Sequence, residues 1–295
     1  MLLSIDTSSL RNIFDDETAL KMIKEAGFDG VDYSMFYATA ERDMLDDNYI
    51  EKAYKVKELL KELGLVCNQA HAPFSFGLSN KFDLSDYEYL RIVRSLEFAS
   101  IINAKNIVVH AIKNDIPEDF DFENYQLKFY NSLIPFCEKF NINISVENLA
   151  GRLIGTGKRF PVFIDPAVHN EFVRKLNNKH FNICLDVGHS SFMGYNPEDV
   201  IMGLDNKLLK IVHIHDNDFK SDSHLLPYEG DINWDAVTTA FAKSGYNGDF
   251  SFELEGFIKK LDKDLIHDAL KYAVNVGWFL IKKIEEKKES LKWTI

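Results

Sequence analysis

Short apolar stretches alternate with longer amphipathic ones along the whole sequence, and this alternation constrains the fold more than any other feature. The short stretches have the length and the Val/Ile content of strands, whereas the longer ones place apolar residues three or four positions apart, as helices do. Strands that are each followed by a helix are typical of parallel βαβ units. We expect eight strands, at residues 2–6, 30–33, 65–71, 106–110, 142–147, 181–187, 208–215 and 249–255.

The segments between these strands carry the expected helices, and glycines such as Gly27 and Gly64 mark some of their ends. A Gly-rich basic loop is expected after the fifth strand, and a frayed Lys/Glu-rich tail at the end of the last helix. No change in composition marks a linker, so we expect one domain over residues 1–295. A closed (β/α)8 TIM barrel is the expected architecture, with an open doubly wound sheet as the alternative. The expected helices are at about residues 16–26, 48–63, 83–102, 120–140, 166–176, 197–204, 231–243 and 261–288.

Composition narrows the class of protein. The hydrophobic fraction of 46% over 295 residues is enough for a sizeable core. A net charge of −12 argues against nucleic acid or an anionic membrane as the main partner. The cysteines Cys67, Cys137 and Cys184 are widely spaced and form no CxxC pair, which is typical of reduced thiols in the cytoplasm. With neither a signal peptide nor a membrane span recognisable, we expect a soluble cytoplasmic protein.

Ionisable residues recur where the expected strands end. In a TIM barrel these carboxyl ends meet at one mouth, where the chemistry takes place. Side chains alternate along a strand, so Glu147 and Glu253 are expected to point into the mouth, where an unpaired charge would be costly. Taken singly, Asp186 could merely cap a turn and His71 could be a core histidine, but the repetition favours a shared site. The residues at the strand ends are His71, His110, Glu147, Asp186, His213 with His215, and Glu253 with Glu255.

A divalent metal ion would neutralise the repulsion among so many carboxylates at one site. Without a cation they would repel one another and raise each other's pKa values. Imidazoles together with carboxylates form a ligand set suited to Zn²⁺, Mn²⁺ or a similar ion. His213 and His215 share one face of their strand, and only one of them needs to be a ligand. Six of the nine histidines lie at strand ends or in the loops just after them: His71, His110, His189, His213, His215 and His224.

Several short motifs follow one another in an order that resembles the xylose isomerase-like TIM barrels. This superfamily includes sugar isomerases, ketose 3-epimerases and the related apurinic endonucleases, and the resemblance spans nearly the whole chain. The motifs are His71-Ala-Pro-Phe74, Val108-Val-His110, Ser145-Val-Glu-Asn148, Leu185-Asp-Val-Gly-His189, Val212-His-Ile-His-Asp-Asn-Asp218, His224-Leu-Leu-Pro-Tyr-Glu-Gly-Asp-Ile-Asn-Trp234 and Ser251-Phe-Glu253.

Resemblance to the epimerases implies one divalent ion, Mn²⁺ or Zn²⁺ in the first place, with Mg²⁺ or Co²⁺ as alternatives. It favours His215 over His213 because the family ligand stands three residues before an Asp, here Asp218. It also implies that two glutamates act as acid and base through a metal-stabilised enediolate, and that His189 contacts substrate oxygens. The implied ligands are Glu147, Asp186, His215 and Glu253, of which Glu147 and Glu253 are the implied catalytic pair.

The endonuclease branch implies a different site, with three zinc ions. The Asp222-Ser-His224 pair departs from the ketose 3-epimerases, which usually carry an Arg in this loop. The strongly acidic charge of the chain counts against a nuclease, because the sequence has no basic stripe that could bind phosphates. A barrel that binds a sugar without catalysis is a further alternative. The additional ligands implied by this branch are His71, His110, His189, Asp222 and His224.

One conspicuous basic segment, residues 151–159, follows Glu147. It could be a solvated loop, or Arg152, Lys158 or Arg159 could bind an acidic substituent such as a sugar phosphate. We therefore expect a cytoplasmic enzyme of sugar metabolism, an isomerase or epimerase that acts on a small sugar, sugar phosphate or polyol. We expect no nucleic acid and no membrane as partner, and the protein could form a homo-oligomer.

Overall fold

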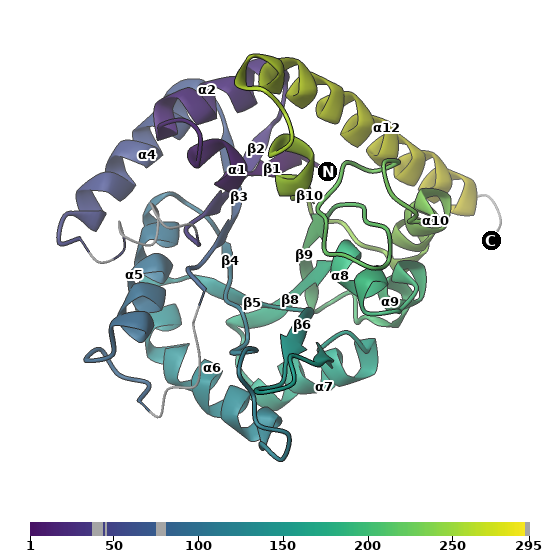
Figure 1. Ribbon diagram of the computed structural model, residues 1–295. Coiled ribbons are helices and arrows are strands. Elements are labelled where there is room, and N and C mark those ends of the chain that lie inside the picture. Colours follow the sequence, from purple (N-terminus) through teal and green to yellow (C-terminus); the bar gives the residue numbers. More distant parts are fainter. Residues whose placement is uncertain (37–43, 45, 75–80, 293–295) are drawn as a thin grey trace.

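Eight parallel strands form a closed barrel with helices around it, as the computed structural model of residues 1–36, 44, 46–74 and 81–292 shows (Figure 1). The order around the ring is β1-β10-β9-β8-β5-β4-β3-β2, so the last strand closes the barrel against the first. The expected single-domain (β/α)8 barrel is confirmed, and the doubly wound sheet is excluded. The barrel strands are β1 (Leu3–Asp6), β2 (Gly30–Ser34), β3 (Val66–His71), β4 (Asn106–Val108), β5 (Asn143–Glu147), β8 (Phe181–Asp186), β9 (Leu209–Ile214) and β10 (Phe250–Phe252).

The helices have the ends that their sequences suggest. In α2 the Asp15 side chain accepts a hydrogen bond from the Thr18 N–H, and Gly27 ends the helix with positive φ. None of the described helices is both long and apolar enough to cross a membrane. The longer helices are α2 (Asp16–Ala26), α4 (Tyr49–Leu63), α5 (Tyr87–Ile101), α6 (Phe122–Phe140), α7 (Pro166–Leu176), α9 (Pro197–Gly203), α10 (Trp234–Ser244) and α12 (Ile266–Lys292), and the short ones are α1 (Ser8–Arg11), α8 (Val187–Phe192), α11 (Glu255–Ile258) and the 3₁₀ turn η1 (Lys263–Leu265).

Strand β5 illustrates how the core and the site are separated. Ile144 and Val146 are completely buried in the main hydrophobic core. Ser145 and Glu147 alternate with them, and the Ser145 hydroxyl donates a hydrogen bond to the Asn182 side chain of β8 at 2.5 Å. The same alternation therefore gives the barrel an apolar outer layer and a polar lining.

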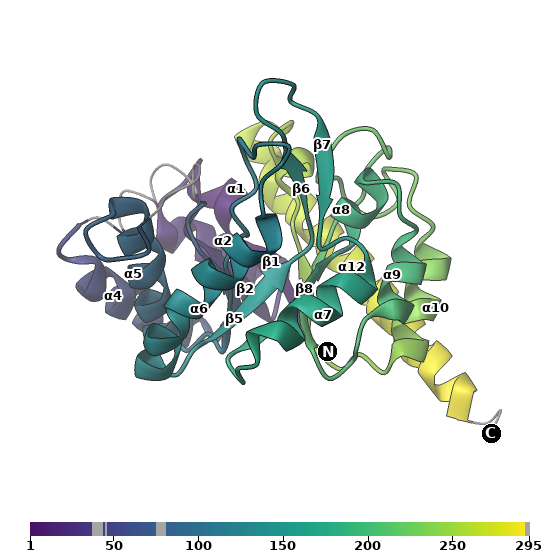
Figure 2. The ribbon, with the colours of Figure 1, turned by 90° about the horizontal axis from the view of Figure 1, so that it is seen from below.

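The basic segment is a β-hairpin, so the expected loop is wrong at this point. Strands β6 (Leu149–Arg152) and β7 (Arg159–Val162) pair in antiparallel register, with Arg152 opposite Arg159. Gly155 and Gly157 have positive φ in the turn between them. Figure 2 shows the hairpin rising above the barrel on one side.

Several element ends also differ from the expectation. Strand β10 stops at Phe252, and Glu255 already begins α11. Helix α8 begins at Val187, because the Asp186 carboxylate accepts a hydrogen bond from the His189 N–H at 2.6 Å and caps it. The capping role considered for Asp186 is thus confirmed, alongside its place at the barrel mouth. The last helix runs from 266 to 292, so the expected fraying does not extend to its Lys/Glu-rich part.

Candidate metal centre and active site

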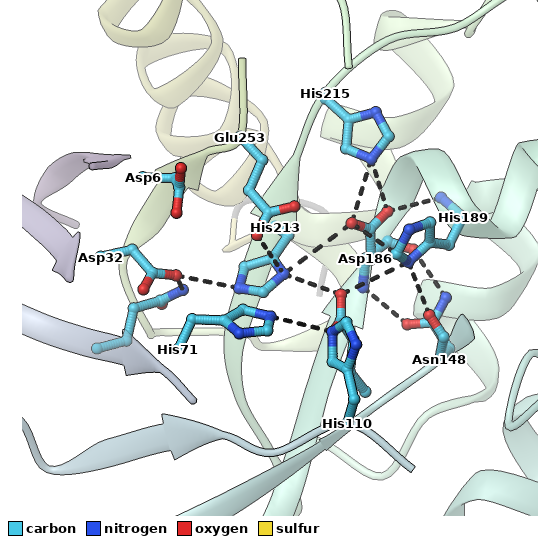
Figure 3. A network of polar contacts seen from close by, with 12 residues as sticks. Asp6, Asp32, His71, His110, Asn148, Asp186, His189, His213, His215 and Glu253 are labelled. Carbon is cyan, nitrogen blue, oxygen red and sulfur yellow. Dashed lines mark hydrogen bonds and ion pairs between the residues drawn. The ribbon is translucent and has the colours of Figure 1, made fainter. Parts of the chain in front are cut away.

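The carboxyl ends of the strands enclose a cavity of about 270 Å³ at the barrel mouth. The polar side chains around it come from strands on all sides of the ring (Figure 3). On one side Phe36 and Phe74 stack at 4.6 Å between ring centroids and form an apolar wall. The cavity is lined by Phe36, His71, Phe74, His110, Lys113, Glu147, His189, Asp222, His224, Glu253 and Glu255.

Glu147 lies at the centre of the first group of potential ligands. Its Oε2 atom is 2.6 Å from His110 Nε2 and 3.7 Å from His71 Nε2. The other nitrogen of His71, Nδ1, lies 3.1 Å from the Ala72 carbonyl oxygen, to which it can donate, so that Nε2 faces the carboxylate. Burial alone would raise the pKa of Glu147, but the imidazoles of His110 and His213 hold it well below its ordinary value.

A second group joins Glu147 with Asp186, His213 and Glu253. Potential ligand atoms of these four buried residues lie within 4.8 Å of one another. His213 Nδ1 is 3.0 Å from Glu147 Oε1 and 3.1 Å from Glu253 Oε1. Burial, together with the nearby Glu255 carboxylate, raises the pKa of Glu253 well above its ordinary value. The environment therefore drives the pKa values of the two glutamates apart.

The third group consists of His189, His215, Asp222 and His224. His189 Nδ1 lies 2.9 Å from the Asn148 carbonyl oxygen, and its Nε2 is 3.3 Å from Asp222 Oδ2. The rings of His215 and His224 stack with centroids 3.9 Å apart. Burial alone would raise the pKa of Asp222, but His189 and His224 lower it well below its ordinary value.

His215 also belongs to the surroundings of Asp186. Its Nε2 atom is 3.1 Å from Asp186 Oδ1. A Cβ added at Gly188, in the first turn of α8, would lie only 2.0 Å from His215 Cε1. The glycine thus lets helix α8 lie directly against the imidazole.

Several polar atoms in these groups suit a metal ion. Within the described part of the chain, the buried atoms Glu147 Oε2, His110 Nε2 and His224 Nδ1 make no hydrogen bond of good geometry, although Glu147 Oε2 lies 2.6 Å from His110 Nε2 and His224 Nδ1 lies 3.0 Å from Glu255 Oε2. Leaving such an atom unsatisfied costs about 1–3 kcal/mol, which a coordinated cation would offset. Mixed nitrogen and oxygen donors around an acidic centre fit a divalent ion of the zinc or manganese type. The structure thus provides groups of side chains that could hold such an ion.

Comparison with known proteins places this architecture in a family. A family model described as "Xylose isomerase-like TIM barrel" matches residues 20–277. The chain belongs to this family. An uncharacterised protein of Sinorhizobium fredii is 26% identical over 265 residues, covering 80% of this chain and 79% of its own.

Solved structures share the fold at lower sequence identity. A D-tagatose 3-epimerase-like protein superposes with a TM-score of 0.76 and 22% identity, over 99% of this chain and 100% of its own. The IOLI protein, solved with a bound zinc atom, has a TM-score of 0.71 and 15% identity, over 98% and 99% of the two chains. At these identities the similarity establishes the fold of the xylose isomerase-like barrel.

The residues expected from the sequence gather at the mouth of this barrel, with one difference in grouping. His71, His110, Glu147, His189, Asp222, His224 and Glu253 all line the cavity. Asp186 and His215 contact each other and are not among the residues that line it. The histidine that contacts both glutamates is His213, whereas the resemblance favours His215 as the ligand. Arg152 lines an adjoining cavity beside His189.

Three polar residues of the site were not expected. The Asp32 carboxylate of β2 is 3.2 Å from His213 Nε2 and accepts a hydrogen bond from Gln69 at 2.7 Å (Figure 3). Asp6, at the end of β1, accepts hydrogen bonds from the hydroxyls of Ser8 and Ser34. Strand alternation alone would have found both carboxylates. Lys113 lies in the loop after β4, and no motif signals its position.

Proposed function

We propose that this xylose isomerase-like barrel is a metal-dependent isomerase or epimerase of a small sugar or polyol. The observation that carries the proposal is the pair Glu147 and Glu253, whose carboxylates both contact one nitrogen of His213 at the mouth of a small cavity. Their pKa values are shifted in opposite directions. Two carboxyl groups in such different environments can divide the roles of acid and base at a sugar carbon.

The remaining residues of the cavity have roles that suit such a reaction. Glu147, Asp186 and Glu253 with His215 would hold the divalent ion, which polarises a substrate carbonyl when it is bound. His189 is fixed at Nδ1 by the Asn148 carbonyl and lines the cavity, where it would contact substrate oxygens. The rings of Phe36 and Phe74 offer an apolar wall to the carbon-bound hydrogens of a polyol. The fold shared with a D-tagatose 3-epimerase-like protein and with the zinc-containing IOLI protein supports this assignment.

Solvent-deuterium incorporation into sugars, with and without Mn²⁺, tests the proposal. We expect exchange at carbon that requires the metal and that falls about 10²–10⁴-fold in Glu253→Gln, because glutamine neither accepts nor donates the proton. Glu255→Gln is the matched control, and we expect a smaller loss because Glu255 is held by Ser8 and His224. If Glu255→Gln loses the metal while Glu253→Gln behaves like the wild type, the ligand assignment passes to Glu255. Absence of exchange with every sugar tested would contradict the proposal.

A second candidate is a zinc phosphodiesterase that cleaves DNA at apurinic sites. It is favoured by the two additional groups, one of His71, His110 and Glu147, the other centred on Asp222. The net charge of −12 counts against DNA as the substrate. Metal analysis together with an abasic-DNA cleavage assay decides between the candidates. Three zinc ions per chain with cleavage would favour the nuclease, whereas a single metal ion without cleavage would favour the isomerase.

A sugar-binding barrel without catalysis is the third candidate. Glu147→Gln distinguishes it from an enzyme, because this variant is expected to abolish deuterium exchange even where the metal remains bound. Exchange that is unaffected by this substitution would argue against the role proposed for Glu147.

A further inference from the structure

A second cavity, of about 480 Å³, lies beside the candidate active site. It shares three lining residues, Lys113, His189 and Asp222, with the cavity that holds the glutamates. The two cavities therefore adjoin, and one ligand can extend from the first into the second. The charged residues that line the second cavity are Lys113, Asp115, Arg152, Arg159, His189 and Asp222.

The β6–β7 hairpin supplies two of these cations at a fixed spacing. Arg152 and Arg159 are directly opposite each other in the antiparallel ladder. The Arg159 guanidinium lies over the ring of Phe192, 4.3 Å from its centroid. Such stacking orients the planar guanidinium while its N–H groups stay available to a ligand. The arginines are thus placed by the hairpin rather than dispersed along a loop.

The three cations of this cavity form no close ion pair with a described carboxylate, although Asp115 also lines the cavity. In the described ranges, no carboxylate lies within 4.0 Å of the charged nitrogens of Lys113, Arg152 or Arg159. Asp222, which lines the same cavity, is engaged by His189 and His224 at 3.3 Å each. In a protein with a net charge of −12, three cations left together at one cavity are unexpected unless an anion binds there.

Lys113 links the two cavities. It is half-buried, and burial lowers the pKa of its ammonium group although Glu147 and Asp222 oppose the shift. A half-buried lysine that does not form an ion pair with these carboxylates gains from a neighbouring anion, which stabilises its charged form. Arginines bind phosphate and carboxylate groups through paired N–H donors, which complements the single charge of the lysine.

We propose that the substrate carries an anionic group, a phosphate or a carboxylate, which Lys113, Arg152 and Arg159 bind in the second cavity while the polyol part lies beside Glu147 and Glu253. This inference rests on the proposed function for the occupant of the first cavity. It deepens that function by naming an acidic sugar derivative as the substrate class.

Calorimetric titration of the Mn²⁺-loaded protein with matched ligands tests the inference. The ligands are D-glucose, D-glucose 6-phosphate and D-glucuronate, with the corresponding D-fructose and D-fructose 6-phosphate pair. We expect the anionic members to bind at least about tenfold more tightly than the neutral sugars, which is the lower end of the effect of a charge-assisted hydrogen bond. A preference for the 6-phosphates identifies a phosphate group, and a preference for glucuronate identifies a carboxylate.

Three variants assign this preference to the cavity. Arg152→Gln and Arg159→Gln should each weaken binding of the preferred anion about tenfold and leave neutral-sugar binding unchanged. Lys158→Gln is the matched control, because it removes one positive charge from the same hairpin at an exposed residue that does not line the cavity. Circular dichroism of each variant verifies that the barrel is folded.

Two results would overturn the inference: equal affinity for neutral and anionic members of every pair, or an equal loss in Lys158→Gln and in both arginine variants. These outcomes are separable from failure of the proposed function. Deuterium exchange on neutral sugars without any anion preference would overturn only the anion site. Anion binding that depends on Arg152 and Arg159, without exchange on any sugar, would support the site and contradict the isomerase.

Discussion

At the scale of single residues, Glu147 organises the site. Its carboxylate lies within 4.0 Å of nitrogen atoms in His71, His110, His189 and His213, so it belongs to more than one group of potential ligands. A substitution there would disturb all of these groups at once. Variants at the margin of the site are more informative, because each changes one contact.

Gly188 is such a position. We expect Gly188→Ala to weaken divalent-metal binding about 10–100-fold, the range seen when the partners of metal ligands are altered. The physical reason is that the new Cβ would lie 2.0 Å from His215 Cε1 and would displace the imidazole from Asp186. Metal titration of the purified protein measures the effect.

Gly155→Ala is the control for loss of a glycine. Its added Cβ would meet no atom within 4 Å, and the strain from its positive φ falls in the turn of the β6–β7 hairpin rather than on His215. Unchanged metal affinity in Gly188→Ala would show that His215 does not contribute to the metal site.

At the scale of elements, the short helix α11 supports the loop that carries Asp222 and His224. The Phe257 N–H donates a hydrogen bond to the His224 carbonyl at 3.1 Å. A Cβ added at Gly256 would lie 1.7 Å from the Ser223 carbonyl oxygen. Helix α11 and this loop therefore approach each other so closely that only glycine fits at the contact.

We accordingly expect Gly256→Ala to shift the loop and to reduce the proposed exchange activity at least about tenfold, together with a destabilisation of about 1–3 kcal/mol from overpacking. Steady-state kinetics and urea unfolding measure the two effects. Gly277→Ala on α12 is the matched control, because its Cβ would press on the Leu3 side chain, 2.5 Å away, and not on the loop. Equal activity of both variants would refute the supporting role of α11.

The elements also differ in how well the sequence predicts them. Apolar alternation identified the barrel strands and directed Glu147 and Glu253 inward, because alternation is a local property of the chain. Strands β6 and β7 have no such pattern. The sequences Leu-Ala-Gly-Arg and Arg-Phe-Pro-Val become recognisable as strands only through their pairing in the folded molecule. The place of Lys113 likewise depends on the path of the loop after β4. His213 and His215 share one face of their strand, so the sequence alone could not tell which partners each of them contacts. The partners differ because the two side chains lie at different depths in the barrel.

At the scale of the whole molecule, one buried histidine outside the site links stability to pH. His169 of α7 is 1% exposed, and its Nε2 lies 3.0 Å from the Val146 carbonyl oxygen, to which it can donate. Burial lowers the pKa of His169 to about 4. The unfolded chain, in which a histidine has a pKa of about 6.5, therefore binds the additional proton between these two pH values.

The resulting stability is fully present above about pH 6.5 and is lost as the pH falls toward 4, by about 3 kcal/mol in total. Urea unfolding as a function of pH measures this loss. In His169→Gln, which keeps a donor for the Val146 carbonyl but does not titrate, we expect the pH dependence to be shallower by that amount. An identical pH profile of wild type and variant would contradict the assignment to His169.

The closure of the barrel has a consequence for the order of events during synthesis. The Leu2 N–H and the Ser8 hydroxyl hydrogen-bond to Asp249 and Glu255, partners 247 positions along the chain. A nascent chain therefore exposes the unpaired edge of β1 until β10 emerges from the ribosome, and such edges invite association with other chains. Glu253 arrives in the same step that seals the ring. The reactive centre is thus completed together with the barrel, so a partly made chain has neither.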